Sequence, residues 1–260
     1  MANTWDPAQY LSFADHRLRP AAELLARVRA DTVASMVDLG CGAGTVAPLL
    51  RSRWPEATYL GVDSSPEMLD RATADQPEAA WLEADVATWR PDRPVDLLYS
   101  NAALHWLPDH QTLLPELMAA LNPGGVLAVQ MPANFDEPTH TTIAEVAQER
   151  DWSVDLEPLL LGAPVDTPGA YHRLLSPVSQ QLDIWTTTYL QELSGPDAVT
   201  AWVSGSALRP VLTALTEAEA REFTAEYTGR VNGHYPRGDS GTTLLPFTRL
   251  FLVATAPDAT

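Results

Sequence analysis

The sequence predicts an α/β protein built on a doubly wound, mostly parallel sheet. Short apolar segments typical of strands alternate with segments typical of helices through the first half of the chain. Only short turns separate them, as repeated βαβ units require. The first apolar run ends in the glycine-rich stretch GCGAG (40–44). Ligands of such sheets bind beyond the carboxyl ends of the strands, so the residues that follow each strand are the candidate site.

The elements of the first half follow in order. TVASMVDL (32–39) is a buried strand that ends at the glycines, and Ser64, Ser65 and Pro66 ahead of Glu67 form a helix start. The turn at 122–125 leads into GVLAVQM. We expect helices at 8–29, 44–53, 64–75 and 110–121, and strands at 32–39, 57–63, 79–85, 95–101 and 125–131.

In the second half the alternation weakens. Residues 139–150 and 196–230 have helical patterns, whereas 151–169 is predicted to be a loop. Residues 180–190 are rich in β-branched and aromatic side chains and predict a strand. LFLVATA (250–256) is the last expected strand. The segment 191–247 between these two strands is too long for a hairpin, which predicts a mostly helical cap.

Composition excludes several classes of function. The chain has 260 residues and a net charge of −18, and its 16 basic residues are all Arg. We expect neither nucleic acid nor an anionic membrane surface as a partner, because both attract basic patches.

The single cysteine, Cys41, allows no intramolecular disulfide and no cysteine metal cluster. The N-terminus has no leader-like pattern, so a cytoplasmic location is expected. A metal is not expected, and the chain is predicted to be a monomer or a small homo-oligomer.

Three acids stand at consecutive strand ends. Asp38 precedes the glycines, Asp63 ends the second strand and Asp85 ends the third. An acid about 20 residues after the glycines can accept both hydroxyls of a ribose. Asp85 can accept from an exocyclic amine, while Val86 and Met68 offer apolar contact to a base. Each acid alone is equally compatible with a helix N-cap.

The motifs DLGCGAG, GVDSS, EADV and SNAALHW resemble class I S-adenosylmethionine-dependent methyltransferases. The resemblance implies a Rossmann-like sheet of seven strands with the last strand antiparallel. It implies that Asp38 faces the methionine ammonium, that Asp63 binds the ribose and Asp85 the adenine amine, and that Asn101 lies near the sulfonium. Cys41 is interpreted as a small residue of the turn. The predicted cofactor site is Asp38, Gly40, Cys41, Gly42, Asp63, Ser64, Met68, Asp85, Val86 and Asn101.

Further segments, among them the N-terminal WDPAQYLSFADHRLRP, GGVLAVQMPANFDEPTH and LPFTRLFLVA, are similar to the trans-aconitate 2-methyltransferase family. The resemblance implies esterification of a carboxylate on a small tricarboxylate. Such a nucleophile is already ionised at neutral pH and needs no general base. Arginine forks suit the remaining carboxylates. The predicted substrate residues are His16, Arg17, Arg19, Asn134, Arg209, Tyr235 and Arg249, with His105 and Trp106 at the mouth of the site.

Other functions compete with this interpretation. A methyltransferase for a phenol or an amine would more often need a base, for which His105 is the candidate. A non-catalytic S-adenosylmethionine-binding module keeps the same three acids. A nicotinamide dehydrogenase fits less well, because Thr45 stands where a small third residue is usual and Asp38 would have no cation to bind. The chain is expected to be one methyltransferase domain, with an N-terminal lid at 1–30 that closes over the ligands, a cofactor core at 31–135 and a cap at 191–247.

Overall fold

The computed structural model describes residues 18–160 and 165–259 of the chain. These residues form two compact units, which are described separately. Of the described residues, unit 1 comprises 18–131, 166–186 and 250–259, and unit 2 comprises 132–160, 165 and 187–249. His16, Arg17 and the first part of the predicted N-terminal helix lie outside the described residues.

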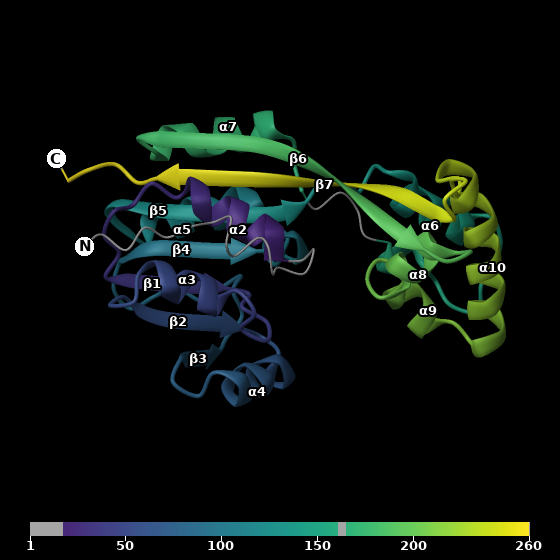
Figure 1. Cartoon of the computed structure of the whole chain (residues 1–260), viewed down its shortest axis with the longest axis horizontal. Helices are drawn as coiled ribbons and strands as arrows, with labels where there is room; N and C mark the ends of the chain where they lie inside the picture. Colours follow the sequence, from purple (N-terminus) through teal and green to yellow (C-terminus); the bar gives the residue numbers. More distant parts are fainter. Residues whose placement is uncertain (1–17, 161–164, 260) are drawn as a thin grey trace. The chain divides into compact units, whose positions relative to one another are not determined.

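A seven-stranded sheet runs in the order β3-β2-β1-β4-β5-β7-β6 (Figure 1). The pairs from β3 to β5 are parallel. Ala256 N donates to Gly125 O, and Ala133 N donates to Thr248 O, so β7 runs antiparallel to β5. The predicted seven-stranded sheet with an antiparallel last strand is therefore confirmed. The strands are β1 (Ser35–Leu39), β2 (Thr58–Asp63), β3 (Ala80–Glu83), β4 (Val95–Asn101), β5 (Leu121–Pro132), β6 (Gln181–Ser194) and β7 (Thr242–Thr255).

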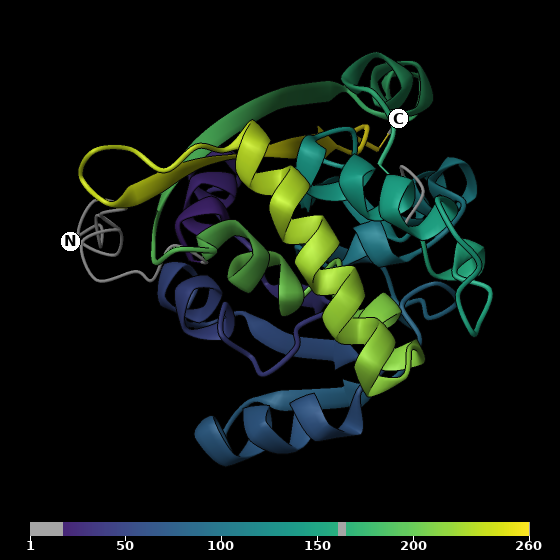
Figure 2. The ribbon, with the colours of Figure 1, turned by 90° about the vertical axis from the view of Figure 1, so that its right-hand side faces the viewer.

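In unit 1, helices cover both faces of the sheet. Helices α2 and α3 lie on one face and α5 on the other (Figures 1 and 2). Tyr99 on β4 donates a hydrogen bond to Ala21 O, and Arg53 on α3 donates one to Leu25 O, so α2 is tied both to the sheet and to α3. The helices of this unit are α2 (Leu18–Arg27), α3 (Ala47–Arg53), α4 (Pro66–Asp75), α5 (His110–Ala119) and α7 (Pro168–Leu175).

Unit 2 has its own apolar core. Phe223, Tyr227 and Val231 project from one face of the longest helix and are fully buried. The hydroxyl of Tyr227 donates to Thr139 O at a distance of 3.0 Å. This satisfies the one polar atom of a buried ring. The helices of the unit are α6 (Pro138–Gln148), α8 (Ala198–Ser204), α9 (Arg209–Ala214) and α10 (Glu217–His234).

Three elements differ most from the sequence-based expectation. Strand β7 begins at Thr242, eight residues before the expected start of the last strand at Leu250, so residues 242–247 of the expected cap form part of a strand. Strand β5 begins at Leu121, before the glycines that were expected to precede it. Helix α7 was not predicted, since its Pro and Gly favour a loop. The structure shows why a helix forms there: Thr167 caps it by accepting from Ala170 N, and Pro168 takes the first helical position, where its missing N–H costs nothing.

One carboxylate holds the amino ends of three neighbouring strands. Asp96 on β4 accepts hydrogen bonds from Ala34 N and Ser35 N beside β1, and from the side chain of Asn122 on β5. Although burial raises the pKa of Asp96, these hydrogen bonds outweigh burial and hold it below its ordinary value. The ionised carboxylate therefore stabilises the fold.

We expect Asp96→Asn to lower the free energy of unfolding by about 1–3 kcal/mol at pH 7, because an amide cannot accept all of these bonds. The folded pKa lies below the unfolded one. The wild-type advantage is therefore fully present at neutral pH and shrinks as the pH falls through the folded pKa. Urea unfolding at several pH values measures this, with Asp92→Asn on the exposed loop before β4 as the control. An equal loss in both variants would contradict this role for Asp96.

Candidate functional site

The three glycines after β1 meet different surroundings. All have positive φ, namely 71° at Gly40, 54° at Gly42 and 73° at Gly44. A Cβ at Gly40 would lie 2.1 Å from the Cβ of Ala103, and a Cβ at Gly44 would lie 2.5 Å from the ring of Trp81. At Gly42 nothing lies within 4 Å of that position. Only Gly42 therefore leaves its backbone open to a ligand, while the other two serve packing.

The third glycine is held by side chains from outside the loop. Gln76 at the end of α4 donates to Gly44 O at 2.9 Å, and its own backbone carbonyl accepts from the indole of Trp81 at 3.2 Å. The Trp81 ring also covers Gly61 in β2, where a Cβ would approach to 2.4 Å. Trp81 thus fixes both the loop and the strand beside it.

Asp63 closes the loop from the end of β2. Its two carboxylate oxygens accept from Gly42 N at 2.8 Å and from Ser65 N at 2.9 Å. A carboxylate has about four acceptor positions, so two remain for ligand hydroxyls. The residue predicted to bind a ribose also orients the open glycine.

Asp38 is the most unusual group of the site. Its side chain is 2% exposed, and the described hydrogen bond to it comes from the hydroxyl of Tyr59 at 3.2 Å. Its pKa is raised to about 7: burial is the largest cause, the charge of Asp63 adds to the rise, and the hydrogen bond from Tyr59 opposes it. A carboxylate without water around it is stabilised by a cation. An ammonium group is therefore the chemistry that Asp38 is suited to bind.

The other predicted cofactor residues also lie in unit 1. Asp85 is exposed and accepts from Ala87 N through Oδ1, whereas the Val86 side chain is buried. Ser64 is exposed, and Met68 on α4 keeps 38% of its surface exposed. At the end of β4 the Oδ1 atom of Asn101 is buried and has no hydrogen-bond partner among the described residues. Such an orphaned acceptor fits a ligand that supplies a donor.

The thiol of Cys41 is not a reactive group. It is 7% exposed, and burial together with the nearby acids Asp38 and Asp63 raises its pKa. A thiol that stays protonated is a poor nucleophile. Its predicted role as a small residue inside the turn is a packing role, which agrees with this environment.

A short 3-10 turn, η1 (Leu104–Trp106), follows β4 and carries the two residues predicted at the mouth of the site. His105 is 7% exposed, whereas Trp106 keeps 55% of its surface exposed. Their ring centroids are 4.7 Å apart. An exposed tryptophan beside a buried histidine offers an apolar surface to a ligand.

The predicted substrate residues are divided between the two units. In unit 1, Arg19 on α2 pairs with Glu23 of its own helix at 2.8 Å and is largely exposed. In unit 2, Asn134 is 3% exposed and its Oδ1 lacks a hydrogen-bond partner among the described residues. Arg209 is exposed at the start of α9. These residues stay predictions as ligands of an acceptor.

Two further substrate candidates of unit 2 are less exposed: Tyr235 is buried and Arg249 is half-buried. The hydroxyl of Tyr235 lies 3.5 Å from Glu137, and burial followed by the Glu137 charge raises its pKa to about 12. Arg249 on β7 lies over the ring of Phe247 at 4.7 Å. Burial lowers the Arg249 pKa to about 10, while its interaction with Tyr189 raises it. The guanidinium is still charged at neutral pH, and in such surroundings it would bind a carboxylate strongly.

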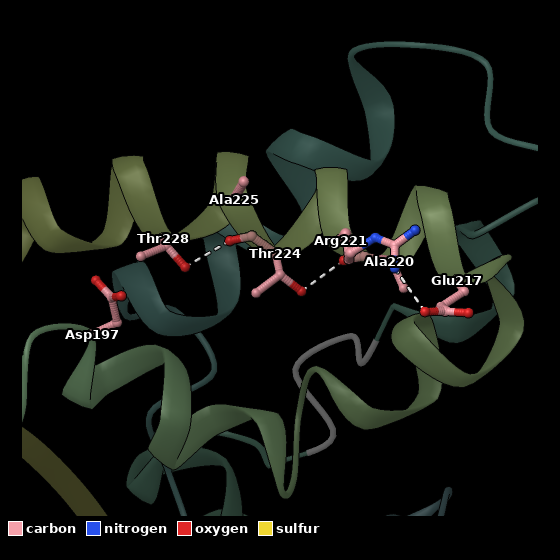
Figure 3. Close-up of a pocket in the computed structure, with 7 residues that line it drawn as sticks. All are labelled: Asp197, Glu217, Ala220, Arg221, Thr224, Ala225 and Thr228. Atoms are coloured by element: carbon pink, nitrogen blue, oxygen red, sulfur yellow. Dashed lines mark hydrogen bonds and ion pairs between the residues drawn. The ribbon is translucent and has the colours of Figure 1, made fainter.

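A surface hollow of about 500 Å³ in unit 2 lies along α10 (Figure 3). Its polar groups are already engaged: Thr224 donates to Ala220 O, Thr228 donates to Thr224 O, and Arg221 pairs with Glu217. None of the predicted site residues lines it. We therefore assign it no ligand.

Two kinds of feature are absent from the described residues. Among residues 18–160 and 165–259, no group of three or more His, Cys, Asp or Glu side chains is arranged to hold a metal ion. Within the same part of the chain, no helix is both long enough and apolar enough to cross a membrane.

Comparison with known proteins agrees with this geometry. Residues 10–176 match the family model described as a methyltransferase domain. Trans-aconitate 2-methyltransferase of Azoarcus sp. is 48% identical over 96% of this chain and 98% of its own length. The protein of that name from Shigella dysenteriae is 45% identical over 96% and 97% of the two chains.

Solved structures share the fold at low sequence identity. The YcgJ protein of Bacillus subtilis is 14% identical and covers 92% of this chain and 98% of its own, with a TM-score of 0.58. A Haemonchus contortus phosphoethanolamine N-methyltransferase, solved with S-adenosylhomocysteine, is 14% identical and covers 91% of this chain and 52% of its own, with a TM-score of 0.55.

The sheet order, the glycine loop and the matched domain define a methyltransferase with a Rossmann-like fold. Within that class, the chain belongs to the trans-aconitate 2-methyltransferase family, as its near full-length identity to those proteins shows.

Sequence reasoning missed the residues that support the loop. Tyr59 reaches Asp38 from the neighbouring strand, and Gln76 and Trp81 hold Gly44. The sequence does contain one indication: Tyr59 and Trp81 are aromatic residues with a polar atom, in two short strands that are otherwise mostly apolar. Their partners depend on strand register, which the sequence does not display.

The close approach of Gly40 and Ala103 predicts that substitutions at these two positions have coupled effects on the free energy of unfolding. We expect Gly40→Ala to destabilise the protein by about 2–4 kcal/mol, from left-handed strain and the clash with Ala103. Removing the opposing methyl in Gly40→Ala/Ala103→Gly should restore about 1 kcal/mol or more, leaving the strain. A double-mutant cycle in chemical denaturation measures this. Strictly additive effects would show that the two residues do not meet.

Proposed function

We propose that this protein transfers a methyl group from S-adenosylmethionine to a carboxylate oxygen of trans-aconitate, giving a monomethyl ester and S-adenosylhomocysteine. The observation that carries the proposal is the buried carboxylate of Asp38 beside an open glycine, in a chain 44–48% identical to proteins named for that reaction. Bound S-adenosylmethionine supplies an electrophilic methyl group on a positively charged sulfur.

The donor is held by residues of unit 1. Asp38 pairs with the ammonium of the methionine portion, and Gly42 lets the backbone approach it. Asp63 accepts from the ribose hydroxyls with its two remaining acceptor positions. Asp85 accepts from the adenine amine beside the apolar contacts of Val86 and Met68. Ser64 flanks the nucleoside, and the orphaned oxygen of Asn101 meets the donor near the sulfur.

The chemistry requires alignment more than proton transfer. A carboxylate is ionised at neutral pH, since its ordinary pKa is about 4. It can attack the methyl carbon directly while the carbon–sulfur bond breaks and the electron pair leaves with sulfur. No proton moves in this step. The rate gain then comes from holding the oxygen, methyl and sulfur in line and from excluding water.

The acceptor carries three negative charges, in a protein of net charge −18. Local arginines are needed to offset that repulsion. Arg249 is the strongest candidate, because partial burial strengthens its attraction for a carboxylate. The further residues proposed to bind the acceptor are His16, Arg17, Arg19, Asn134, Arg209 and Tyr235.

His105 and Trp106 are proposed to contact the acceptor at the mouth of the site. The competing function is methylation of a phenol or an amine, in which His105 would act as a base. That function predicts activity that falls steeply below about pH 6.5 and follows a single histidine. The carboxylate mechanism predicts no such dependence on His105.

We propose the following organisation of the enzyme. The chain is one methyltransferase domain in which residues 1–30 close over the ligands and residues 191–247 form the acceptor cap. It works in the cytoplasm as a monomer or a small homo-oligomer, without nucleic acid.

The Asp38→Asn variant tests the proposed binding site of the methyl donor. The folded pKa near 7 exceeds the ordinary value of 3.8, so wild-type stability falls as the pH rises between these values. Above pH 7 the variant should be more stable than the wild type by about 2 kcal/mol or more, or about 5 °C in Tm. Differential scanning calorimetry from pH 4 to pH 9 measures the difference, which should vanish near pH 4.

The same variant should bind S-adenosylhomocysteine at least about 100-fold more weakly, through loss of a buried ion pair. Titration calorimetry gives this affinity. Asp96→Asn, which affects the opposite ends of the strands, serves as the control and should keep wild-type affinity. Wild-type affinity in Asp38→Asn would overturn the assignment of the ammonium site.

The identity of the methyl acceptor is tested with a panel of four small acids. Methyl transfer to trans-aconitate, cis-aconitate, isocitrate and citrate, with mass detection of the ester, should show the highest kcat/KM for trans-aconitate. Arg249→Gln should raise the KM for that acceptor about 10-fold or more, since a partly buried ion pair is lost, and leave the affinity for S-adenosylhomocysteine unchanged.

Arg221→Gln is the matched control, because Arg221 is an exposed arginine of unit 2 that pairs within its own helix. It should keep the wild-type KM. If Arg249→Gln behaves like this control, Arg249 does not bind the acceptor. If none of the four acids is methylated, the proposed acceptor is wrong.

A further inference from the structure

The loop between β4 and α5 is held under backbone strain. Ala102 has φ 55° and Asp109 has φ 56°, and these are the non-glycine residues with positive φ in the described part of the chain. They bracket the η1 turn that carries His105 and Trp106. L-residues adopt this conformation at a cost in free energy, and it persists only where surrounding contacts enforce it. The structure must therefore contain contacts that hold residues 102–109.

A buried hydrogen-bond chain supplies such contacts from α7. Asp166 N donates to the hydroxyl of Tyr171 at 3.0 Å, and that hydroxyl lies 2.6 Å from Nδ1 of His110. Nε2 of His110 lies 2.9 Å from Leu104 O. Tyr171 is 1% exposed and His110 is 7% exposed. These hydrogen bonds thus connect α7, which is distant in the sequence, to Leu104, the first residue of the η1 turn.

The chemistry of the groups fixes the protons along this chain. Leu104 O only accepts, so Nε2 of His110 carries the hydrogen. In a neutral ring Nδ1 then accepts, and the Tyr171 hydroxyl donates to it while accepting from Asp166 N. Each donor meets one acceptor with the ring neutral. The position of Leu104 thereby depends on the hydroxyl of Tyr171.

We propose that Tyr171 and His110 are positioning residues, through which α7 holds the η1 turn so that His105 and Trp106 meet the acceptor. This rests on the proposed function, in which those two residues contact the acceptor. It gives a role to α7, a helix that the sequence did not predict. Tyr171 and His110 themselves touch neither ligand.

This role is more than general stabilisation, because of what the turn carries. Trp106 is 55% exposed and the described contact of its ring is with His105, so the position of the ring depends on the backbone of the turn. A side chain of this kind recognises a ligand well only where its backbone is held. Loosening the turn should therefore weaken binding of the acceptor more than binding of the methyl donor, because the proposed contacts of the methyl donor come mainly from the ends of β1, β2 and β3.

Hydrogen–deuterium exchange and kinetics test the proposal with Tyr171→Phe, His110→Ala and His110→Gln. Tyr171→Phe should speed exchange of the peptides that cover 102–109 about 10-fold and leave those of β2 and β3 unchanged. It should raise the KM for trans-aconitate about 5-fold or more, and keep the affinity for S-adenosylhomocysteine within twofold. His110→Gln keeps an N–H within reach of Leu104 O and should recover part of what His110→Ala loses.

His172→Gln is the control, because His172 is exposed on the same helix; it should match the wild type in every measurement. Unchanged exchange over 102–109 in both Tyr171→Phe and His110→Ala would overturn the proposal. So would a loss of donor affinity equal to the loss for the acceptor, which would indicate a structural role only. Exchange is read without substrate, so it decides this inference even if trans-aconitate is not methylated.

Discussion

The site depends on one constraint, a carboxylate that the fold removes from water before any ligand arrives. Asp38 lies inside the sheet at the end of β1 with the hydroxyl of Tyr59 as its described hydrogen-bond donor, and Asp63 adds a second negative charge nearby. This arrangement costs stability in the free protein. It is relieved by a cation, so the same interaction that weakens the fold favours a ligand that carries an ammonium group.

The surrounding loop presents this carboxylate by dividing its glycines between packing and binding. Gly40 is pressed against Ala103 and Gly44 against Trp81, while Gly42 alone remains open. Asp63 then fixes the open glycine through its N–H. The proposed methyl-donor site thus packs closely against its own protein at Gly40 and Gly44 and is open at Gly42, which is the preorganisation that the proposed reaction requires.

Much of this could be predicted from the sequence, because it follows from local pattern. The alternation of strands and helices predicted the sheet, and acids at successive strand ends predicted the candidate site. Helix α7 was missed because Pro168 and Gly169 favour a loop until Thr167 is seen to cap them. Tyr59 and Trp81 were missed because register brings them to the loop. The acceptor residues, which fall in separate units, were predicted from the charge of the tricarboxylate that the family resemblance implies and from the chemistry of arginine.

The central claim is that Asp38 gives up a proton to receive a cation. Titration of S-adenosylhomocysteine into the protein at pH 6.5, in buffers of different ionisation enthalpy, measures the protons exchanged on binding. With the Asp38 pKa near 7 in the free protein, binding should release about 0.5–0.8 proton per site, and this release should disappear at pH 9. Binding of the ligand at pH 6.5 with no proton release would contradict the account.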